Sequence, residues 1–307
     1  MKTLLLAILF IFVSSLGVSA LSMFDKVNDF DGDGKADYAV TRNENGLKVW
    51  HIFRSTAGYL SIQWGVADDT VTAGDYDGDG RTDPAVTRLT NFVDNRYYYT
   101  TFYLASGTNA FGMVDVNALS SIGALALNNE DYDGDGKTDP GLFQWHGIGF
   151  LAYRMSSTGT QGGAGMSWFQ VKVGDLNGDN AADIASFDPG TQELVIVQGA
   201  VGRVRWGSGG DRWVPADFDG DNKGDIAIFR PGTGDWWWIR SSDSVVNVVH
   251  WGVNGDIPVQ ADYDGDSKTD LAIYRPGSPN GVFWVSGSSG STSAFSWGVA
   301  GDTVVQY

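Results

Sequence analysis

The sequence of 307 residues contains no cysteine. This absence excludes disulfide bonds, thiolate metal ligands, a catalytic thiol and a lipid-modified cysteine. Glutamate is nearly absent too, because only Glu44, Glu130 and Glu193 occur among 37 acidic residues. Histidine occurs three times, at widely separated positions, so the chain offers little material for a histidine-based triad or a zinc site.

Long apolar runs are missing except at the N-terminus. Residues 4–13 are all apolar, Lys2 precedes them, and Val18-Ser19-Ala20 follows. This order predicts a secretory signal peptide, residues 1–20, that is cleaved after Ala20. The run is about half the ~20 residues that cross a bilayer, so we expect no membrane insertion. The sequence therefore predicts a secreted, extracellular protein, with the periplasm as the alternative location.

Basic residues are scarce relative to acidic ones. The chain has 20 Lys and Arg against 37 Asp and Glu, a formal net charge of -17, which becomes -18 when Lys2 leaves with the signal peptide. Such a chain repels nucleic acid, and we expect no nucleic-acid partner. Disorder is excluded because 42% of the residues are hydrophobic and 13% are aromatic. The preference for the shorter carboxylate indicates loops built for chelation.

An internal repeat organises the chain. The pattern D-x-D-G-D-x-x-x-D occurs six times with one substitution, and its copies begin 46, 56, 44, 42 and 45 residues apart. We call the copies loops one to six, and they begin at Asp29, Asp75, Asp131, Asp175, Asp217 and Asp262. A second marker, Trp-Gly followed by Gly-Asp or Asp-Asp, begins at Trp64, Trp206, Trp251 and Trp297. Such a period is typical of a repeat architecture.

Each loop runs into short segments rich in β-branched and aromatic residues, and none has a sustained helical period. First strands are expected at Tyr38–Arg42, Ala85–Leu89, Gly141–Trp145, Ile184–Phe187, Ile226–Arg230 and Leu271–Arg275. Second strands are expected at Leu47–Phe53, Tyr97–Leu104, Phe150–Met155, Glu193–Val197, Trp236–Arg240 and Val282–Val285. Four short strands in each repeat predict an all-β, six-bladed β-propeller with one loop per blade.

The end of the chain bears on how the ring closes. The last marker, Gly301-Asp302, would place a further loop at position 308, one residue beyond the sequence. We therefore expect strand 302–307 to pack beside the first loop and close a single propeller domain, residues 21–307, built from six repeats. A seventh blade inside the 56-residue second repeat is the alternative, although that spacing is short for two blades.

The loop spacing suits a hard cation. Calcium takes six to eight oxygens at ~2.4 Å, and carboxylates at loop positions 1, 3, 5 and 9 with the backbone carbonyl at position 7 can wrap one ion. Glycine at positions 4 and 6 permits the sharp turn that this requires. Magnesium prefers a rigid octahedron and zinc prefers nitrogen or sulfur, so we predict about six structural calcium ions. The predicted ligands are Asp29, Asp31, Asp33, Lys35, Asp37, Asp75, Asp77, Asp79, Arg81, Asp83, Asp131, Asp133, Asp135, Lys137, Asp139, Asp175, Asn177, Asp179, Ala181, Asp183, Asp217, Asp219, Asp221, Lys223, Asp225, Asp262, Asp264, Asp266, Lys268 and Asp270.

An EF-hand is the obvious rival, but it needs glutamate at position 12 and a helix after the loop. Position 12 holds Val40, Val86, Leu142, Ser186, Ile228 and Ile273. The loops, the strands after them and the period of 42 to 56 residues resemble FG-GAP/VCBS-type repeats, the calcium-binding blades also found in the integrin α-subunit propeller. This resemblance covers nearly the whole mature chain, and it implies calcium in inter-strand turns at the propeller edge. Such propellers serve adhesion, lectin and scaffold roles and also accompany some enzymes.

Three loops depart from the pattern. Loop four has Asn177 at position 3 and Asn180 at position 6. Position 6 is Asn222 in loop five and Ser267 in loop six. Asparagine still offers an oxygen and tolerates a left-handed turn, whereas serine suits that turn less. We predict that loops four and six bind calcium most weakly.

Calcium can do the work of the missing disulfides. Six ions change the charge of the mature chain from -18 to -6. In ~1 mM calcium, sites with a Kd on the order of 10⁻⁴ to 10⁻³ M contribute roughly 2 to 8 kcal/mol in total. That is comparable to the whole stability of an ordinary domain.

The acids outside the loops show no pair that breaks the repeat, as a general acid and its partner would. Aromatic runs such as Trp236-Trp237-Trp238 favour packing between blades, with sugar stacking as the alternative. The longer second repeat, Asn91–Asn129, is the best place for a specific surface. We therefore predict a secreted calcium-binding propeller that acts as a binding or adhesion module, with a protein or carbohydrate ligand on a propeller face. The alternatives are a polysaccharide-active lyase or hydrolase with its site on such a face, and a purely structural surface or matrix protein.

Overall fold

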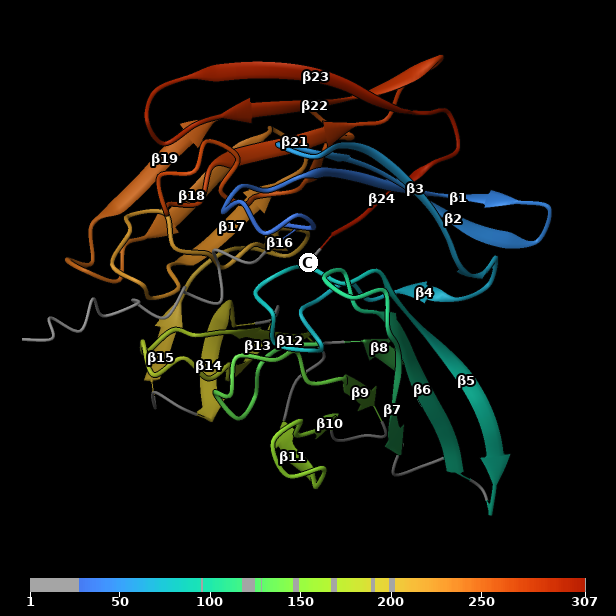
Figure 1. Cartoon of the computed structure of the whole chain (residues 1–307). Coiled ribbons are helices and arrows are strands. Elements are labelled where there is room, and N and C mark those ends of the chain that lie inside the picture. Colours follow the sequence, from blue (N-terminus) through green and yellow to red (C-terminus); the bar gives the residue numbers. More distant parts are fainter. Residues whose placement is uncertain are drawn as a thin grey trace, which may run out of the picture.

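The computed structural model describes residues 28–94, 96–117, 125–127, 129–145, 149–166, 170–188, 191–198 and 202–306. Within these ranges all the regular structure is β, and it forms six four-stranded antiparallel sheets. The sheets are arranged around a centre as the blades of a propeller (Figure 1). The predicted all-β, six-bladed fold is confirmed, whereas the predicted signal peptide lies outside the described residues. No helix of the described ranges is long and apolar enough to cross a membrane.

In each blade four strands lie side by side, and we describe them from the innermost strand at the centre of the propeller to the outermost one (Figure 1). The innermost strands are β4 (Thr70–Val71), β8 (Leu125–Leu127), β12 (Gln170–Gly174), β16 (Arg212–Trp213), β20 (Ile257–Pro258) and β24 (Thr303–Val304). The second strands are β1 (Tyr38–Glu44), β5 (Ala85–Val93), β9 (Gly141–Trp145), β13 (Asp183–Asp188), β17 (Ile226–Arg230) and β21 (Leu271–Arg275). The third strands are β2 (Leu47–Arg54), β6 (Arg96–Leu104), β10 (Gly149–Arg154), β14 (Glu193–Gln198), β18 (Asp235–Ile239) and β22 (Asn280–Ser286). The outer strands are β3 (Gly58–Val66), β7 (Phe111–Asn117), β11 (Gln161–Met166), β15 (Gly202–Arg205), β19 (Val246–His250) and β23 (Thr292–Val299).

The strands lie close to the predicted ranges, and the largest difference is in the second repeat. There β5 continues beyond Leu89 to Val93, and β6 pairs with it from Arg96 onward. Part of the extra length of this repeat therefore forms a long hairpin. Among the described residues no seventh sheet is present.

The C-terminal strand belongs to the first repeat's sheet. β24 pairs with β1, with Val304 opposite Val40 and Thr303 opposite Thr41. The Val305 N–H also donates to the carbonyl oxygen of Ala39 at 3.0 Å. We number the blades by their second strands, so blade one has the order β24-β1-β2-β3 and joins the two ends of the described chain.

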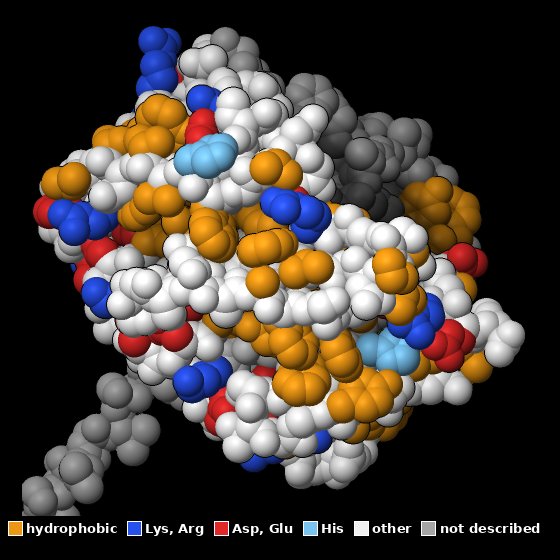
Figure 2. Space-filling model, turned by 90° about the horizontal axis from the view of Figure 1, so that it is seen from above, with side chains coloured by type: hydrophobic (Ala, Val, Ile, Leu, Met, Phe, Trp, Pro, Cys, Tyr) orange, Lys and Arg blue, Asp and Glu red, His pale blue; other side chains and the backbone are white. Residues whose placement is uncertain are grey.

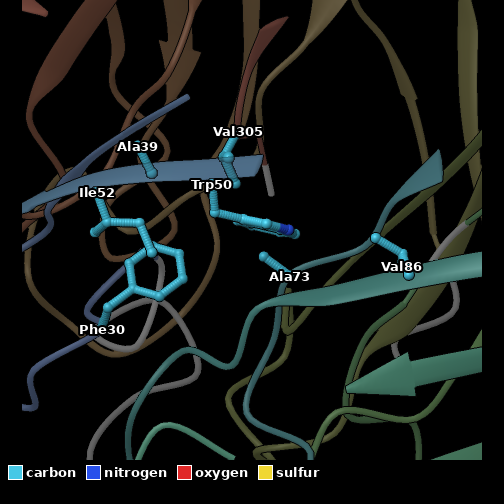
Figure 3. Close-up of a cluster of buried hydrophobic side chains, with 7 residues drawn as sticks. All are labelled: Phe30, Ala39, Trp50, Ile52, Ala73, Val86 and Val305. Atoms are coloured by element: carbon cyan, nitrogen blue, oxygen red, sulfur yellow. The ribbon is translucent and has the colours of Figure 1, made fainter. Parts of the chain in front are cut away.

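The hydrophobic core is divided among the contacts between neighbouring blades, since one blade cannot bury both faces of its sheet alone. Between blades one and two, Trp50 is fully buried and lies between Val305 and Ala73, next to Phe30 and other apolar side chains (Figure 3). Comparable clusters join blade two to three, three to four, four to five, five to six and six to one. The ring is therefore held by apolar contact along its whole circumference.

The tryptophan of the Trp-Gly marker joins one blade to the next at three places. The indole N–H of Trp64 in blade one donates to the carbonyl oxygen of Phe102 in blade two at 3.1 Å. The equivalent bonds run from Trp251 to Trp284 at 3.3 Å and from Trp297 to His51 at 3.1 Å. This use of tryptophan agrees with the predicted role of the aromatic residues in packing between blades.

The aspartate of the second marker forms a turn and an ion pair. Asp69 accepts the N–H of Val66 at 2.8 Å and the Arg88 guanidinium at 2.6 Å. Burial opposes the ionisation of Asp69, but the bonds from Arg88 and Val66 and the charges of Arg88 and Lys48 together outweigh it and hold the pKa of Asp69 below its usual value. The equivalent pairs are Asp211–Arg230, Asp256–Arg275 and Asp302–Arg42. The last pair joins the end of the chain to the first blade.

Candidate metal centres

The six loops lead into the second strands of their blades, and in blades two to six they follow the innermost strands. They therefore lie in inter-strand turns, as expected, but between the two strands nearest the centre. In loop one the first carboxylate, Asp29, accepts the N–H groups of Gly32 at 2.7 Å and Gly34 at 2.9 Å. Both glycines have φ in the left-handed region, +74° and +82°, which explains why the pattern needs glycine here. The same two bonds recur in the other loops, from Gly78 and Gly80, Gly134 and Gly136, Gly178 and Asn180, Gly220 and Asn222, and Gly265 and Ser267.

In five loops the last carboxylate links the loop to a turn between the third and outer strands. Asp37 accepts the N–H of Phe30 at 2.8 Å and, on its other oxygen, the N–H of Ser55 at 2.7 Å. The equivalent serines, bonded at 2.6 to 2.7 Å, are Ser106, Ser156, Ser241 and Ser288. These serines were not among the predicted site residues. The signal that could have found them is a serine 16 to 23 residues after the last aspartate of a loop.

In each of five loops, three carboxylates lie close enough together to bind one metal ion. One oxygen from each member lies within 4.8 Å of the others, and every member is an aspartate. The groups are Asp29, Asp31 and Asp33; Asp75, Asp77 and Asp83; Asp131, Asp133 and Asp139; Asp217, Asp219 and Asp225; and Asp262, Asp264 and Asp270. An all-oxygen donor set of this kind fits a hard cation and lacks the nitrogen or sulfur that zinc prefers.

The third loop position carries an unsatisfied oxygen. In the described part of the chain, Oδ1 of this aspartate is buried and has no hydrogen-bond partner in four loops, at Asp31, Asp133, Asp219 and Asp264. A buried carboxylate oxygen without a partner is costly, and repeating that cost at one position of four blades calls for a common cause. A cation bound among the three carboxylates would satisfy this oxygen. The residues present therefore fit a calcium ion.

The last carboxylate is also electrostatically unfavourable without a cation. The pKa of Asp37 is raised to about 8, mainly by burial, while the N–H groups of Ser55 and Phe30 oppose the shift and the charges of Asp31 and Asp29 add to it. Burial likewise raises to about 7 the pKa values of Asp83, Asp139, Asp225 and Asp270. Buried carboxylates of this kind need either a proton or a counter-ion.

The fifth position lies farther out in most loops. Loop one is the loop in which the convergent group includes the fifth carboxylate, Asp33. In loops one, three, five and six this carboxylate accepts the hydroxyl of the covering serine, as at Asp135 with Ser156 at 2.7 Å and Asp221 with Ser241 at 2.8 Å. The structure therefore brings together positions 1, 3 and 9 of the predicted set in four loops and positions 1, 3 and 5 in loop one. In four loops it joins position 5 to the serine turn.

Loop four differs from the others. Its first carboxylate, Asp175, keeps the bonds from Gly178 at 2.6 Å and Asn180 at 2.8 Å. At position 3, however, the Asn177 amide donates to Asp183 at 2.9 Å and to Asp179 at 3.1 Å. No convergent group of three acids is found in this loop among the described residues, because its third position is an amide.

Comparison with known proteins supports the repeat. Residues 29–86, which run from loop one through loop two to the start of β5, match the FG-GAP-like repeat family. The chain thus carries an FG-GAP-like repeat within a β-propeller. It is similar in fold to a streptogramin B lyase structure, with 8% identity, a TM-score of 0.44, and coverage of 91% of this chain and 85% of that one. It is also similar to the crystal structure of a protein from Lactobacillus plantarum, with 8% identity, a TM-score of 0.41, and coverage of 86% and 82%. At this level of similarity the two structures do not indicate an activity for this chain. No curated protein matches the sequence.

Proposed function

We propose that this FG-GAP propeller is a secreted binding module that bound calcium stabilises. The observation that carries the proposal is the group of three convergent aspartates at equivalent places in five blades. The residues that would hold each ion are the carboxylates at positions 1, 3, 5 and 9 and the carbonyl at position 7. When bound, calcium supplies the positive charge that these buried carboxylates lack. Its role is thus structural, in a chain that has no cysteine.

The proposed calcium binding can be tested by measuring the metal content of the protein. Purified protein is dialysed against ~1 mM calcium, a typical extracellular concentration, and its metal content is measured by elemental analysis. We expect five or six calcium ions per chain and a clear fall in melting temperature in excess EDTA. Protein that carries no alkaline-earth metal after this dialysis would refute the proposal.

The ligand is proposed to bind on the outer surface of the propeller. Seen from above the view of Figure 1, this surface carries bands of hydrophobic side chains between charged ones (Figure 2). Val246 and Val248 of β19 and Trp284 of β22 are exposed apolar residues of blades five and six. The tip of the β5–β6 hairpin, which points to the bottom of Figure 1, carries exposed Phe92 and Val93 on another part of the molecule. Clustered apolar exposure of this kind is typical of binding surfaces, and a protein or a carbohydrate is the proposed ligand.

Binding and catalysis are separated by one pair of assays. Binding to a glycan array is measured with and without calcium, and the retained oligosaccharides are then tested for cleavage. Retention without cleavage supports a binding module, whereas turnover would identify a polysaccharide-active enzyme. Phe92→Ala and Val248→Ala, on separate blades, then show which surface takes part.

A further inference from the structure

Consecutive metal loops contact one another directly. The N–H at position 8 of each loop donates to the carbonyl oxygen of the first aspartate of the preceding loop, with N···O distances of 2.6 to 2.7 Å. The six bonds run from Thr82 to Asp29, Thr138 to Asp75, Ala182 to Asp131, Gly224 to Asp175, Thr269 to Asp217 and Ala36 to Asp262. The last bond joins loop one to loop six. The six loops therefore form a closed ring of hydrogen bonds.

A second contact follows the same direction around the ring. The basic side chain at position 7 lies over the glycine at position 4 of the preceding loop. A Cβ added at Gly32 would lie 2.9 Å from Nε of Arg81, and one at Gly265 would lie 2.8 Å from Cε of Lys35. Lys35 also donates from Nζ to the carbonyl oxygen of Asp264 at 2.9 Å. The equivalent contacts are Lys137 on Gly78, Lys223 on Gly178 and Lys268 on Gly220.

One peptide group takes part in both the contact and the metal site. The carbonyl at position 7 is a proposed calcium ligand, and the N–H at position 8 belongs to the same peptide plane. In a trans peptide these two groups point in opposite directions. Because the N–H points at the preceding loop, the carbonyl points away from that loop, as a ligand of its own ion must. An ion on the carbonyl would polarise the peptide and strengthen its N–H as a donor.

The acceptor of this bond is equally significant. It is the first aspartate of the preceding loop, and in five of the six loops the carboxylate of this aspartate belongs to the convergent group. Anchoring its main chain lowers the ordering cost of the next ion to bind. We propose that the loops bind calcium cooperatively, each occupied loop preorganising the preceding one, an inference that rests on the proposed calcium binding.

Loop four weakens the ring at one place. Its seventh residue is Ala181, whose Cβ would lie 3.6 Å from a Cβ added at Gly134, an ordinary contact. The side-chain contact between loops four and three is therefore the least extensive of the six. Coupling between these two loops is accordingly the weakest.

The first test is the calcium-binding isotherm of the full chain, measured by equilibrium dialysis. We expect a Hill coefficient above about 1.5 for the unaltered protein, with each occupied loop raising its neighbour's affinity about fivefold or more. The double variant Arg81→Ala and Lys137→Ala removes two inter-loop contacts and no carboxylate. It should bring the coefficient closer to one, while both main-chain carbonyls at position 7 are kept. Arg203→Ala with Arg205→Ala, two exposed positions on β15, removes the same charge away from the loops and should leave the coefficient unchanged.

The second test needs no change at the contacts. Asp77→Asn in loop two removes one carboxylate, and the metal content is compared at half-saturating calcium. Independent loops would lose about half a bound ion per chain, the share of one half-occupied site, whereas coupled loops lose more than that. A loss of only about half an ion, or a Hill coefficient of one for the unaltered chain, would overturn the coupling alone. Absence of bound calcium in the unaltered chain would overturn the proposed function as well.

Discussion

Loop four and the other five loops share a backbone but satisfy their carboxylates in different ways. In all six, the first aspartate accepts N–H groups from positions 4 and 6, so the turn itself is the same. In five loops the last aspartate accepts a serine N–H from the covering turn, as Asp37 does from Ser55. In loop four the Asn177 amide also donates to the last aspartate, Asp183.

This difference separates the folding of a loop from its need for a metal. The first aspartate and the left-handed residues build the turn in every blade. The residue at position 3 decides whether the site has an internal donor or an excess of acceptors, since an amide has N–H groups and a carboxylate has none. Loop four is therefore built to hold its shape without a cation, whereas the others contain buried acceptors that a cation would satisfy.

Removing calcium should have the largest effect, and pH should modulate it. Because the pKa of Asp37 is raised to about 8, and those of four equivalents to about 7, protonation stabilises the calcium-free fold. That stabilisation is complete below the unfolded value of about 3.9 and is lost as pH rises through about 7 to 8. Calcium needs ionised carboxylates, so its contribution has the opposite dependence. We expect EDTA to remove roughly 2 to 8 kcal/mol at alkaline pH and much less near pH 5.5, measured by thermal melts.

Magnesium is the control for that experiment. At the same concentration it should restore less of the melting temperature than calcium, because it tolerates irregular oxygen sites poorly. A gap between the calcium and EDTA melts that stays constant from about pH 5.5 to 8 would contradict the account of the five buried aspartates.

Asn177→Asp should give loop four the carboxylate that it lacks. In EDTA the variant loses the amide donors to Asp183 and Asp179 and places a third carboxylate beside them. We expect it to be destabilised by about 1 to 3 kcal/mol in that medium. In excess calcium the loss should shrink or reverse, because the loop then resembles the other five. Paired denaturant titrations measure the change of sign, and equal loss in both media would show that position 3 does not determine metal affinity.

Much of this comparison could be predicted from the sequence, because the repeat is visible in it. The aspartate spacing predicted the loops and the six blades, and Asn177 marked loop four as different. The serine turns were missed because Ser55 lies 18 residues from Asp37 and touches it only when the blade has folded. The ion pairs of the second marker were missed too, although Asp69 and Arg88 are 19 residues apart and two other pairs repeat that spacing. The direction in which the Asn177 amide donates depends on the folded site and has no signal in the sequence.

Asp133→Asn should make loop three resemble loop four. Oδ1 of Asp133 is one of the buried oxygens without a partner in the described chain, and an amide at this position can donate to its neighbours. In ~1 mM calcium we expect a loss of about 1 kcal/mol, the share of a single site. In EDTA the variant should be as stable as the unaltered protein or more so. Isothermal calorimetry should find one ion fewer, and an unchanged ion count would contradict the assignment.

Ser267→Gly tests the smallest difference, the predicted weakness of loop six. Ser267 has φ of +64° and still donates its N–H to Asp262 at 2.8 Å, close to the 2.9 Å of Gly34 in loop one. The turn is thus intact, and serine brings only the strain of a left-handed residue. Glycine should remove that strain and stabilise the fold by about 0.5 to 1 kcal/mol, less than the strain itself because it also frees the unfolded chain.

Gly34→Ser is the matched control for this prediction, because φ is +82° there and a Cβ would have no neighbour within 4 Å. It should destabilise loop one by the same amount through backbone strain alone. If both substitutions change the melting temperature in EDTA and in calcium equally, the serine affects the turn and not the ion. Loop six would then bind calcium as tightly as its neighbours, and loop four would be the weak member of the ring. A calcium affinity that rises with Ser267→Gly would instead show that strain at position 6 is transmitted to the ligands.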